Sequence, residues 1–279
     1  IATGNLEEYI ADDIHTAFPT LAYTERPDRF SAGVVEGRVG LLIDGLPLGW
    51  LLPGTLSQFF KTPQDKSQGW MAASALMVLR YLCMLITLFL PAVYIAAVTF
   101  HLEMLPTELA LSIIAAKQDV PFTTVFEVLL MLVAFEIIQE AGLRLPSSIG
   151  QTVSILGGLV VGSAAVEARI VSPAVLIVVA VAGIAGYTMP SQDFAGALRI
   201  WRFGLAALAS LAGMFGAAIG ALLLICHLAS LESFGVAYLT PFAANDGEQV
   251  EGHAVIRQPL PSVKLRETAL KTQNRRNQR

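Results

Sequence analysis

The chain has 279 residues, of which 54% are hydrophobic and only 14% are charged, and its mean hydropathy is +0.63. Soluble domains carry about 25% charged residues, so this composition excludes an ordinary soluble protein and indicates a mainly α, polytopic helical membrane protein. The formal net charge of −4 hides an uneven distribution, because the first 69 residues are acidic whereas the tail from Arg257 onward is basic. A basic tail beside a membrane segment favours a cytoplasmic location over nucleic-acid binding.

Residues 1–69 are predicted to be the end of a soluble, cytoplasmic α/β domain. Apolar residues at helical spacing indicate a helix over 6–14. Two β-type runs, 39–43 and 48–52, are separated by Asp44, Gly45 and Pro47, which favour a hairpin turn. A short helix or a lid is predicted over 55–65.

Residues 70–231 are predicted to form the transmembrane domain, followed by a polar, basic tail over 232–279. A membrane-crossing helix needs ~20 mostly apolar residues. Five stretches meet this need: 71–99, which carries Arg80 and Pro91, then 122–138, the glycine-rich 149–165, the uncharged 171–189, and 203–231, which is long for one crossing. The shorter stretch 106–118 is predicted to lie at the membrane interface.

The expected topology is ambiguous. Lys61, Lys66 and Arg80 place the N-terminal side in the cytoplasm, and the basic tail favours the same side. Two ends on one side need an even number of crossings, whereas the candidates number five. Four crossings plus a re-entrant third segment satisfy this condition but leave Arg199 and Arg202 outside. Five plain crossings keep these two arginines inside and put the tail outside.

Charged residues at membrane depth mark a protein interior, a pore or an interface, because each costs about 2.5–3.5 kcal/mol there. The candidates are Glu127, Glu136, Glu140, Arg144 and Glu167. Glu136 and Glu140 lie one turn apart on a shared helix face, so they either line a cation path or leave Glu140 paired with Arg144. Glu127 points to the opposite face and either reaches the membrane surface or pairs with another helix.

The third candidate segment combines polar residues with glycines. Gln151, Thr152 and Ser154 could line a water-filled passage or bond their own backbone. Small residues four apart allow helices to approach closely, and the candidates for such packing are Gly158 with Gly162 and Gly216 with Gly220. Packing inside one chain is the simpler interpretation of each pair.

Enzymatic motifs are missing from the sequence. The histidines are scattered, His101 and Glu103 are two residues apart, and neither the two cysteines nor any phosphate-binding loop has a functional spacing. We therefore expect no catalytic residue, no metal site and no cofactor.

The words EAGLRLP, SIGQTVSILGGLVVG and AAVEA between residues 140 and 168 resemble the signature of the GerA family, the A subunits of spore germinant receptors. VEGRVGLLIDGLPLGWLLP before them and SFGVAYLTPFA after them extend the resemblance over nearly the whole chain. The resemblance implies a larger soluble domain ahead of Ile1, so the chain is expected to be truncated.

The resemblance also implies a function. Such a subunit works with a transporter-like B subunit and a lipoprotein C subunit in the spore inner membrane, and forms an oligomer that conducts monovalent cations. Gln139, Ser163 and Arg169 depart from the family pattern. These departures leave open a non-conducting membrane scaffold, or a paralogue such as the related stage V sporulation membrane protein, that supports the transporter-like subunit.

Overall fold

The computed structural model describes residues 3–144 and 160–242, together with 255–257, 259, 266, 270, 272 and 273. Helices make up 66% of the structure, so the prediction of a mainly α fold is confirmed. The chain forms two compact units. The first contains residues 1–82, 188–197 and 223–279, and the second contains 83–187 and 198–222.

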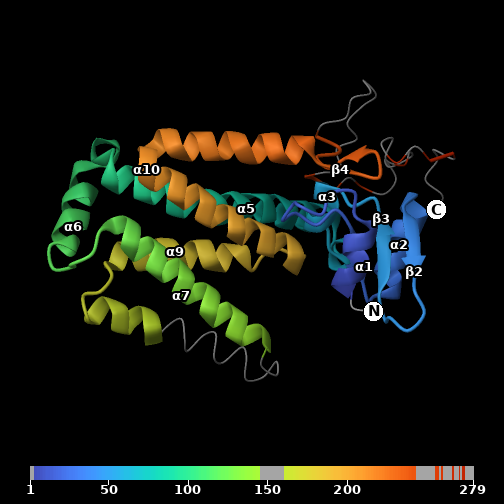
Figure 1. Ribbon diagram of the computed structural model, residues 1–279, viewed down its shortest axis with the longest axis horizontal. Coiled ribbons are helices and arrows are strands. Elements are labelled where there is room, and N and C mark those ends of the chain that lie inside the picture. Colours follow the sequence, from blue (N-terminus) through green and yellow to red (C-terminus); the bar gives the residue numbers. More distant parts are fainter. Residues whose placement is uncertain are drawn as a thin grey trace. The chain divides into compact units, whose positions relative to one another are not determined.

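The first unit is built on a small antiparallel sheet (Figure 1). Its strands β1 (Ala22–Thr24), β3 (Gly49–Leu52) and β2 (Val39–Leu42) lie in that order. The pairing of β2 with β3 confirms the predicted hairpin, and the predicted first helix ends earlier, at Ile10 of α1 (Thr3–Ile10). The sequence did not indicate β1 or α2 (Pro27–Glu36), which lies against the sheet.

Aromatic side chains hold the remaining segments of the first unit together. Helices α3 (Leu56–Phe60) and α4 (Pro63–Ser67) follow the sheet. The ring of Phe60 lies 4.0 Å from that of Tyr81 and 5.3 Å from that of Phe194. The short strands β4 (Glu232–Ser233) and β5 (Val236–Ala237) pair with each other, and the Ser233 hydroxyl donates to the carbonyl of Thr20 at 2.7 Å.

A buried ion pair connects α4 to the first turns of α5 (Trp70–Thr99). Arg80 donates two hydrogen bonds to the carboxylate of Asp65, at 2.7 and 2.9 Å, and one to the carbonyl of Phe60. Burial raises the pKa of Asp65, but the bonds from Arg80 and from the Thr62 backbone outweigh it and hold that pKa below its usual value. Arg80 therefore has a structural partner, beyond its role as an orientation signal.

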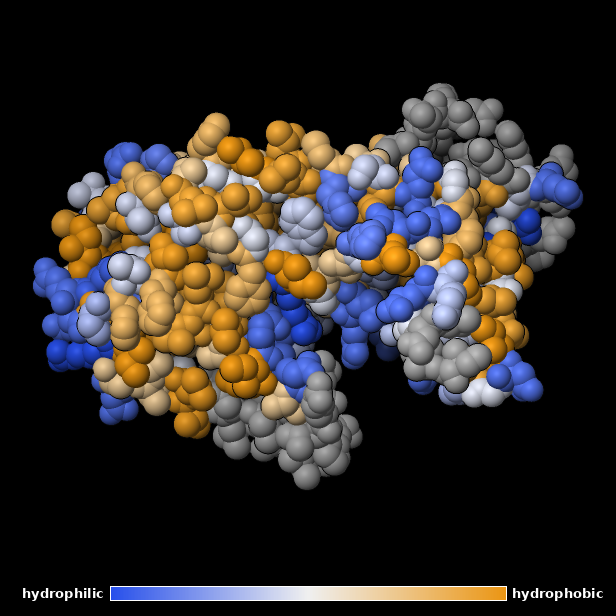
Figure 2. All heavy atoms as spheres, viewed as in Figure 1, coloured by the Kyte–Doolittle hydropathy of each residue, from blue (hydrophilic) through white to orange (hydrophobic). Residues whose placement is uncertain are grey.

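The second unit is a helical bundle. After α5 come the 3₁₀ turn η1 (Leu102–Met104), α6 (Thr107–Lys117), α7 (Thr124–Arg144), a helical turn over 160–167, and α9 (Pro173–Gly186). Its core is a set of buried hydrophobic side chains from α5, α7, the segment before α9, α9 itself and α10 (Gln192–Ser230), namely Ile95, Val128, Met131, Leu132, Val171, Val175, Val179 and Ala206. Hydrophobic residues also cover much of its visible surface (Figure 2), as expected for helices in contact with lipid.

Helix α10 (Gln192–Ser230) is a hairpin, which corrects the prediction of one long crossing over 203–231. Its backbone leaves the helical region at Ala212 and Gly213. A Cβ added to Gly220 would lie 2.6 Å from a methyl group of Leu205. A straight helix would place these two residues ~22 Å apart along its axis. The two ends also meet, since the ring of Phe18 lies 5.8 Å from Phe194 and 6.1 Å from His227. Two antiparallel arms, 192–211 and 214–230, therefore replace one span.

Within the described residues, α5 and α10 are the helices that are long and apolar enough to cross a membrane. The expected count of four or five membrane segments remains a prediction. The third candidate, 149–165, lies mostly outside the described residues, together with Gln151, Ser154 and Gly158.

Replacing Gly213 by alanine is expected to weaken the hairpin by about 1–3 kcal/mol. The φ of +61° and ψ of −139° at this position suit glycine alone, and an added Cβ would lie 3.1 Å from His101 and Phe100. Thermal unfolding in detergent would measure the loss. The matched control is Gly204→Ala inside the first arm, where a Cβ meets no atom within 4 Å and helix propensity predicts a gain. Equal effects of the two changes would contradict the hairpin geometry.

Candidate functional site

A partly buried ionic cluster in the second unit joins α7 to the first arm of α10. Glu136 is flanked by two arginines: its Oε2 lies 3.5 Å from Arg199, and its Oε1 accepts a hydrogen bond from Arg202. The side chain of Arg202 is 3% exposed and that of Glu136 is 23% exposed. The cluster therefore holds two positive charges and one negative charge in a partly buried position, with Arg202 as its buried member.

The local sequence explains how these side chains meet. Arg199 and Arg202 are three residues apart, so they project from one face of the first arm. Gln139 is likewise one turn beyond Glu136, and its buried amide interacts with the hydroxyl of Tyr187 just after α9. Three helices thus contribute polar groups to one place.

This arrangement limits what Glu136 can do. A carboxylate held by two guanidinium groups is already neutralised and serves as a crosslink between helices. Glu140, one turn later, is exposed instead. The expected pairing of Glu140 with Arg144 involves a side chain outside those that the structure describes, so that alternative stays a prediction.

Glu127 forms a second buried site at the other end of α7. Its side chain is fully buried, its Oε2 accepts a 2.8 Å hydrogen bond from the backbone N–H of Ser172, and its Oε1 lies 3.9 Å from the ammonium of Lys117. Ser172 is the N-cap of α9, where a negative charge is favoured. Of the two alternatives for Glu127, the structure shows the pairing with other elements.

The other candidate residues occupy ordinary positions. Glu167 is exposed. A Cβ on Gly162 would lie 2.8 Å from Leu176, and one on Gly216 would lie 2.0 Å from the carbonyl oxygen of Leu208, so these glycines pack inside the chain. His101 and Glu103 approach to 3.7 Å. Among the described residues, no group of three or more metal-binding side chains is found.

Sequence reasoning missed the partners of Glu136. From the sequence, Arg199 and Arg202 are interpreted as orientation signals alone, although two arginines one turn apart beside an apolar run need a counter-charge where they are buried. That signal was present, but it did not indicate which carboxylate they would meet.

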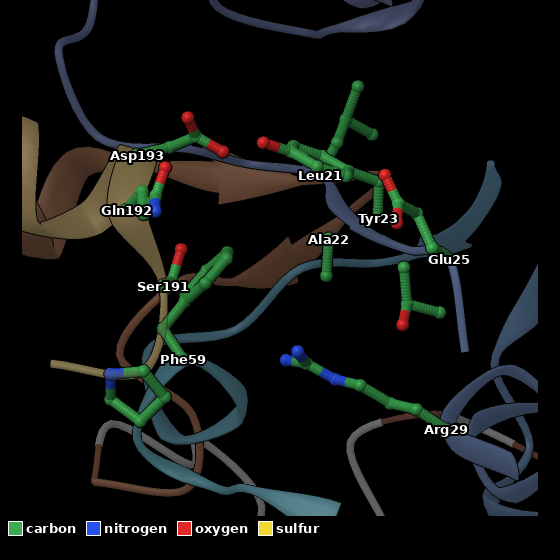
Figure 3. Close-up of a pocket in the computed structure, with 11 residues that line it drawn as sticks. Leu21, Ala22, Tyr23, Glu25, Arg29, Phe59, Ser191, Gln192 and Asp193 are labelled. Atoms are coloured by element: carbon green, nitrogen blue, oxygen red, sulfur yellow. The ribbon is translucent and has the colours of Figure 1, made fainter. Parts of the chain in front are cut away.

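The first unit contains a pocket of about 380 Å³ between β1, the start of α2 and the first turn of α10. In Figure 3 the guanidinium of Arg29 extends toward the open space, with Ser191, Gln192 and Asp193 on the opposite side. Burial, and then the charge of Asp193, raise the pKa of Tyr23 to about 12, so its hydroxyl stays protonated. With charges of both signs on its walls, the pocket suits a small polar molecule.

Replacing Glu136 by glutamine is expected to destabilise the protein by ~3 kcal/mol or more, because it leaves Arg202 buried without a counter-charge. The matched control is Glu140→Gln, which removes an exposed charge on the same helix face and should cost less than about 1 kcal/mol. Unfolding of both variants in detergent would measure the difference. Similar, small losses would mean that Glu136 is not held as described.

Comparison with known proteins identifies the family of this chain. The family described as Bacillus/Clostridium GerA spore germination protein matches residues 1–269. Among Bacillus subtilis proteins, spore germination protein B1 is 43% identical over 266 residues, which is 95% of this chain and 55% of the relative.

Other relatives match this chain over a similar share of its length and of their own. Spore germination protein KA of Bacillus subtilis is 42% identical over 93% of this chain and 47% of its own length, and spore germination protein A1 is 41% identical over 86% and 50%. The chain therefore spans about half the length of these relatives. No solved structure matches it. The match over almost every residue, together with these identities, shows that the chain belongs to the GerA family of spore germination proteins.

Proposed function

We propose that this chain is the membrane part of the A subunit of a spore germinant receptor, which converts germinant binding into the release of monovalent cations from an oligomer. Family membership supports a role related to germinant receptors, and the relatives named above are spore germination proteins. The observation that carries the mechanism is the cluster of Glu136, Arg199 and Arg202, because it can connect a movement of α10 to α7.

The hairpin in α10 offers a solution to the topology. If its arms cross separately, at ~30 and ~26 Å, the five candidate segments become six crossings. Six crossings return the tail to the side of Lys61, Lys66 and Arg80, with Arg199 and Arg202 also on that side. All of these basic residues then lie on the cytoplasmic side of the spore inner membrane, together with the N-terminal domain.

In this mechanism the contact of Glu136 with Arg199 and Arg202, here termed the latch, holds two helices together. Because the carboxylate of Glu136 is shared by two arginines, it holds α7 and the first arm of α10 together in the resting state. Glu140, which is exposed on the same face of α7, is the carboxylate that can meet a passing cation. A transporter-like B subunit and a lipoprotein C subunit would supply the germinant signal.

The engaged state of Glu136 also favours a second candidate function. A subunit whose buried carboxylates, Glu127 and Glu136, hold helices together could act as a non-conducting scaffold that docks the transporter-like subunit, as a sporulation paralogue would. The two functions differ in whether the protein itself passes cations.

Potassium release from liposomes that contain the full-length protein would distinguish the conducting subunit from the non-conducting scaffold. Under the proposed mechanism, Glu136→Gln raises the basal leak because the latch is released, whereas Glu140→Gln lowers the flux because a cation site is lost. Empty liposomes give the baseline. Absence of flux from a folded, oligomeric protein and from both variants would support the scaffold instead.

Cysteine labelling would test the six-crossing topology. Starting from a variant in which Cys83 and Cys226 are replaced by alanine, single cysteines are placed at the exposed positions Ser67, Glu103 and Ser230. With a membrane-impermeant maleimide, Ser67→Cys and Ser230→Cys should react from one side of sealed vesicles and Glu103→Cys from the other. Reaction of Ser230→Cys together with Glu103→Cys would require an odd number of crossings.

A further inference from the structure

The cluster around Glu136 has one positive charge too many. Two guanidinium groups share a single carboxylate, and the Nε of Arg202 is buried without a hydrogen-bond partner. An uncompensated charge in a water-poor site is costly, so such a site selects a counter-ion.

Among the residues that the structure describes, no second carboxylate forms an ion pair with these two arginines. In the second unit, Glu127 is engaged with Lys117, Asp119 pairs with Arg169 at 3.1 Å, and the side chains of Glu140 and Glu167 are exposed. Residues 145–159, which follow α7, contain neither aspartate nor glutamate. Among the described ion pairs, Glu136 is thus the one carboxylate that contacts Arg199 and Arg202, and an anion from outside the chain can supply the second negative charge.

The surroundings of the cluster indicate what kind of molecule supplies it. Arg199 is 27% exposed, so one face of its guanidinium is accessible. Large apolar side chains beside it in the chain and on the neighbouring helices are more than half exposed, namely Ile137, Ile184, Tyr187 and Ile200. An anion that binds here therefore sits against a hydrophobic surface.

The position of Arg199 along α10 also indicates that the anion is bound at the membrane surface. It lies seven residues after the start of α10, ~10 Å along the helix, and no charged residue follows Arg202 within the apolar part of the hairpin. Arginines at the end of an apolar span, next to an exposed tyrosine, lie at the level of lipid headgroups.

We propose that Arg199 binds the phosphate of an anionic phospholipid, whose acyl chains lie on the apolar surface of α7, α9 and α10, while Arg202 adds its charge from behind Glu136. This site depends on the membrane placement of α10 in the proposed function, but it does not require that the protein conduct ions.

Lipid retention would test the site. The full-length protein is reconstituted in nanodiscs of phosphatidylcholine with a minor share of phosphatidylglycerol, extracted in mild detergent, and analysed by native mass spectrometry. The wild type should retain phosphatidylglycerol in preference to phosphatidylcholine. Arg199→Gln should lower this preference about fivefold, the effect of one basic side chain near an anionic headgroup, and Arg199→Lys should largely preserve it.

Two further variants separate this site from general electrostatics. Glu136→Gln increases the surplus charge and should raise retention, the opposite of its effect on stability. Arg169→Gln removes an exposed arginine elsewhere in the same unit and should leave retention unchanged.

Equal retention of both lipids by the wild type, or equal losses in Arg199→Gln and Arg169→Gln, would overturn the proposal. Displacement of the lipid by inorganic phosphate would identify a site for soluble anions instead. Because this readout involves no ion flux, a protein that conducts cations but retains no anionic lipid would contradict this site alone.

Discussion

The constraint that shapes this molecule is the cost of charge in a low-dielectric interior. Among the described residues of the helical unit, Glu136 and Glu127 are both matched to partners on other elements: Glu136 to Arg199 and Arg202, and Glu127 to Lys117 and the start of α9. Such pairs add little net stability when intact, but they impose a large penalty when broken. They therefore specify which helices are neighbours, while aliphatic packing provides the bulk of the cohesion.

The latch and the hairpin depend on each other. The first arm of α10 presents both arginines to α7, and the turn at Ala212 and Gly213 brings the second arm back along the first. Consequently, both ends of α10 belong to the unit that contains the sheet. In the proposed receptor, a movement of that unit would act on α10 at its ends and reach α7 through Glu136.

Much of the fold was predictable because its signals are local. The β2–β3 hairpin follows from two β-type runs around Asp44 and Gly45, and the bounds of α5 follow from a long apolar stretch that contains Arg80 as its one charged residue. The turn in α10 was not predictable, because Gly213 sits in an apolar run with several other glycines and only its backbone torsion distinguishes it. The carboxylates of Glu136 and Glu140 look alike in sequence, and only tertiary packing assigns the arginines to Glu136.

The most direct test of this account is a double-mutant cycle between Glu136 and Arg202. Unfolding free energies of the wild type, Glu136→Gln, Arg202→Gln and the double variant give the coupling energy of the pair. If the cluster joins α7 to α10 as described, the two single changes are strongly non-additive, with a coupling of at least ~1 kcal/mol. Additive losses would show that the two side chains do not interact, and the latch would have to be abandoned.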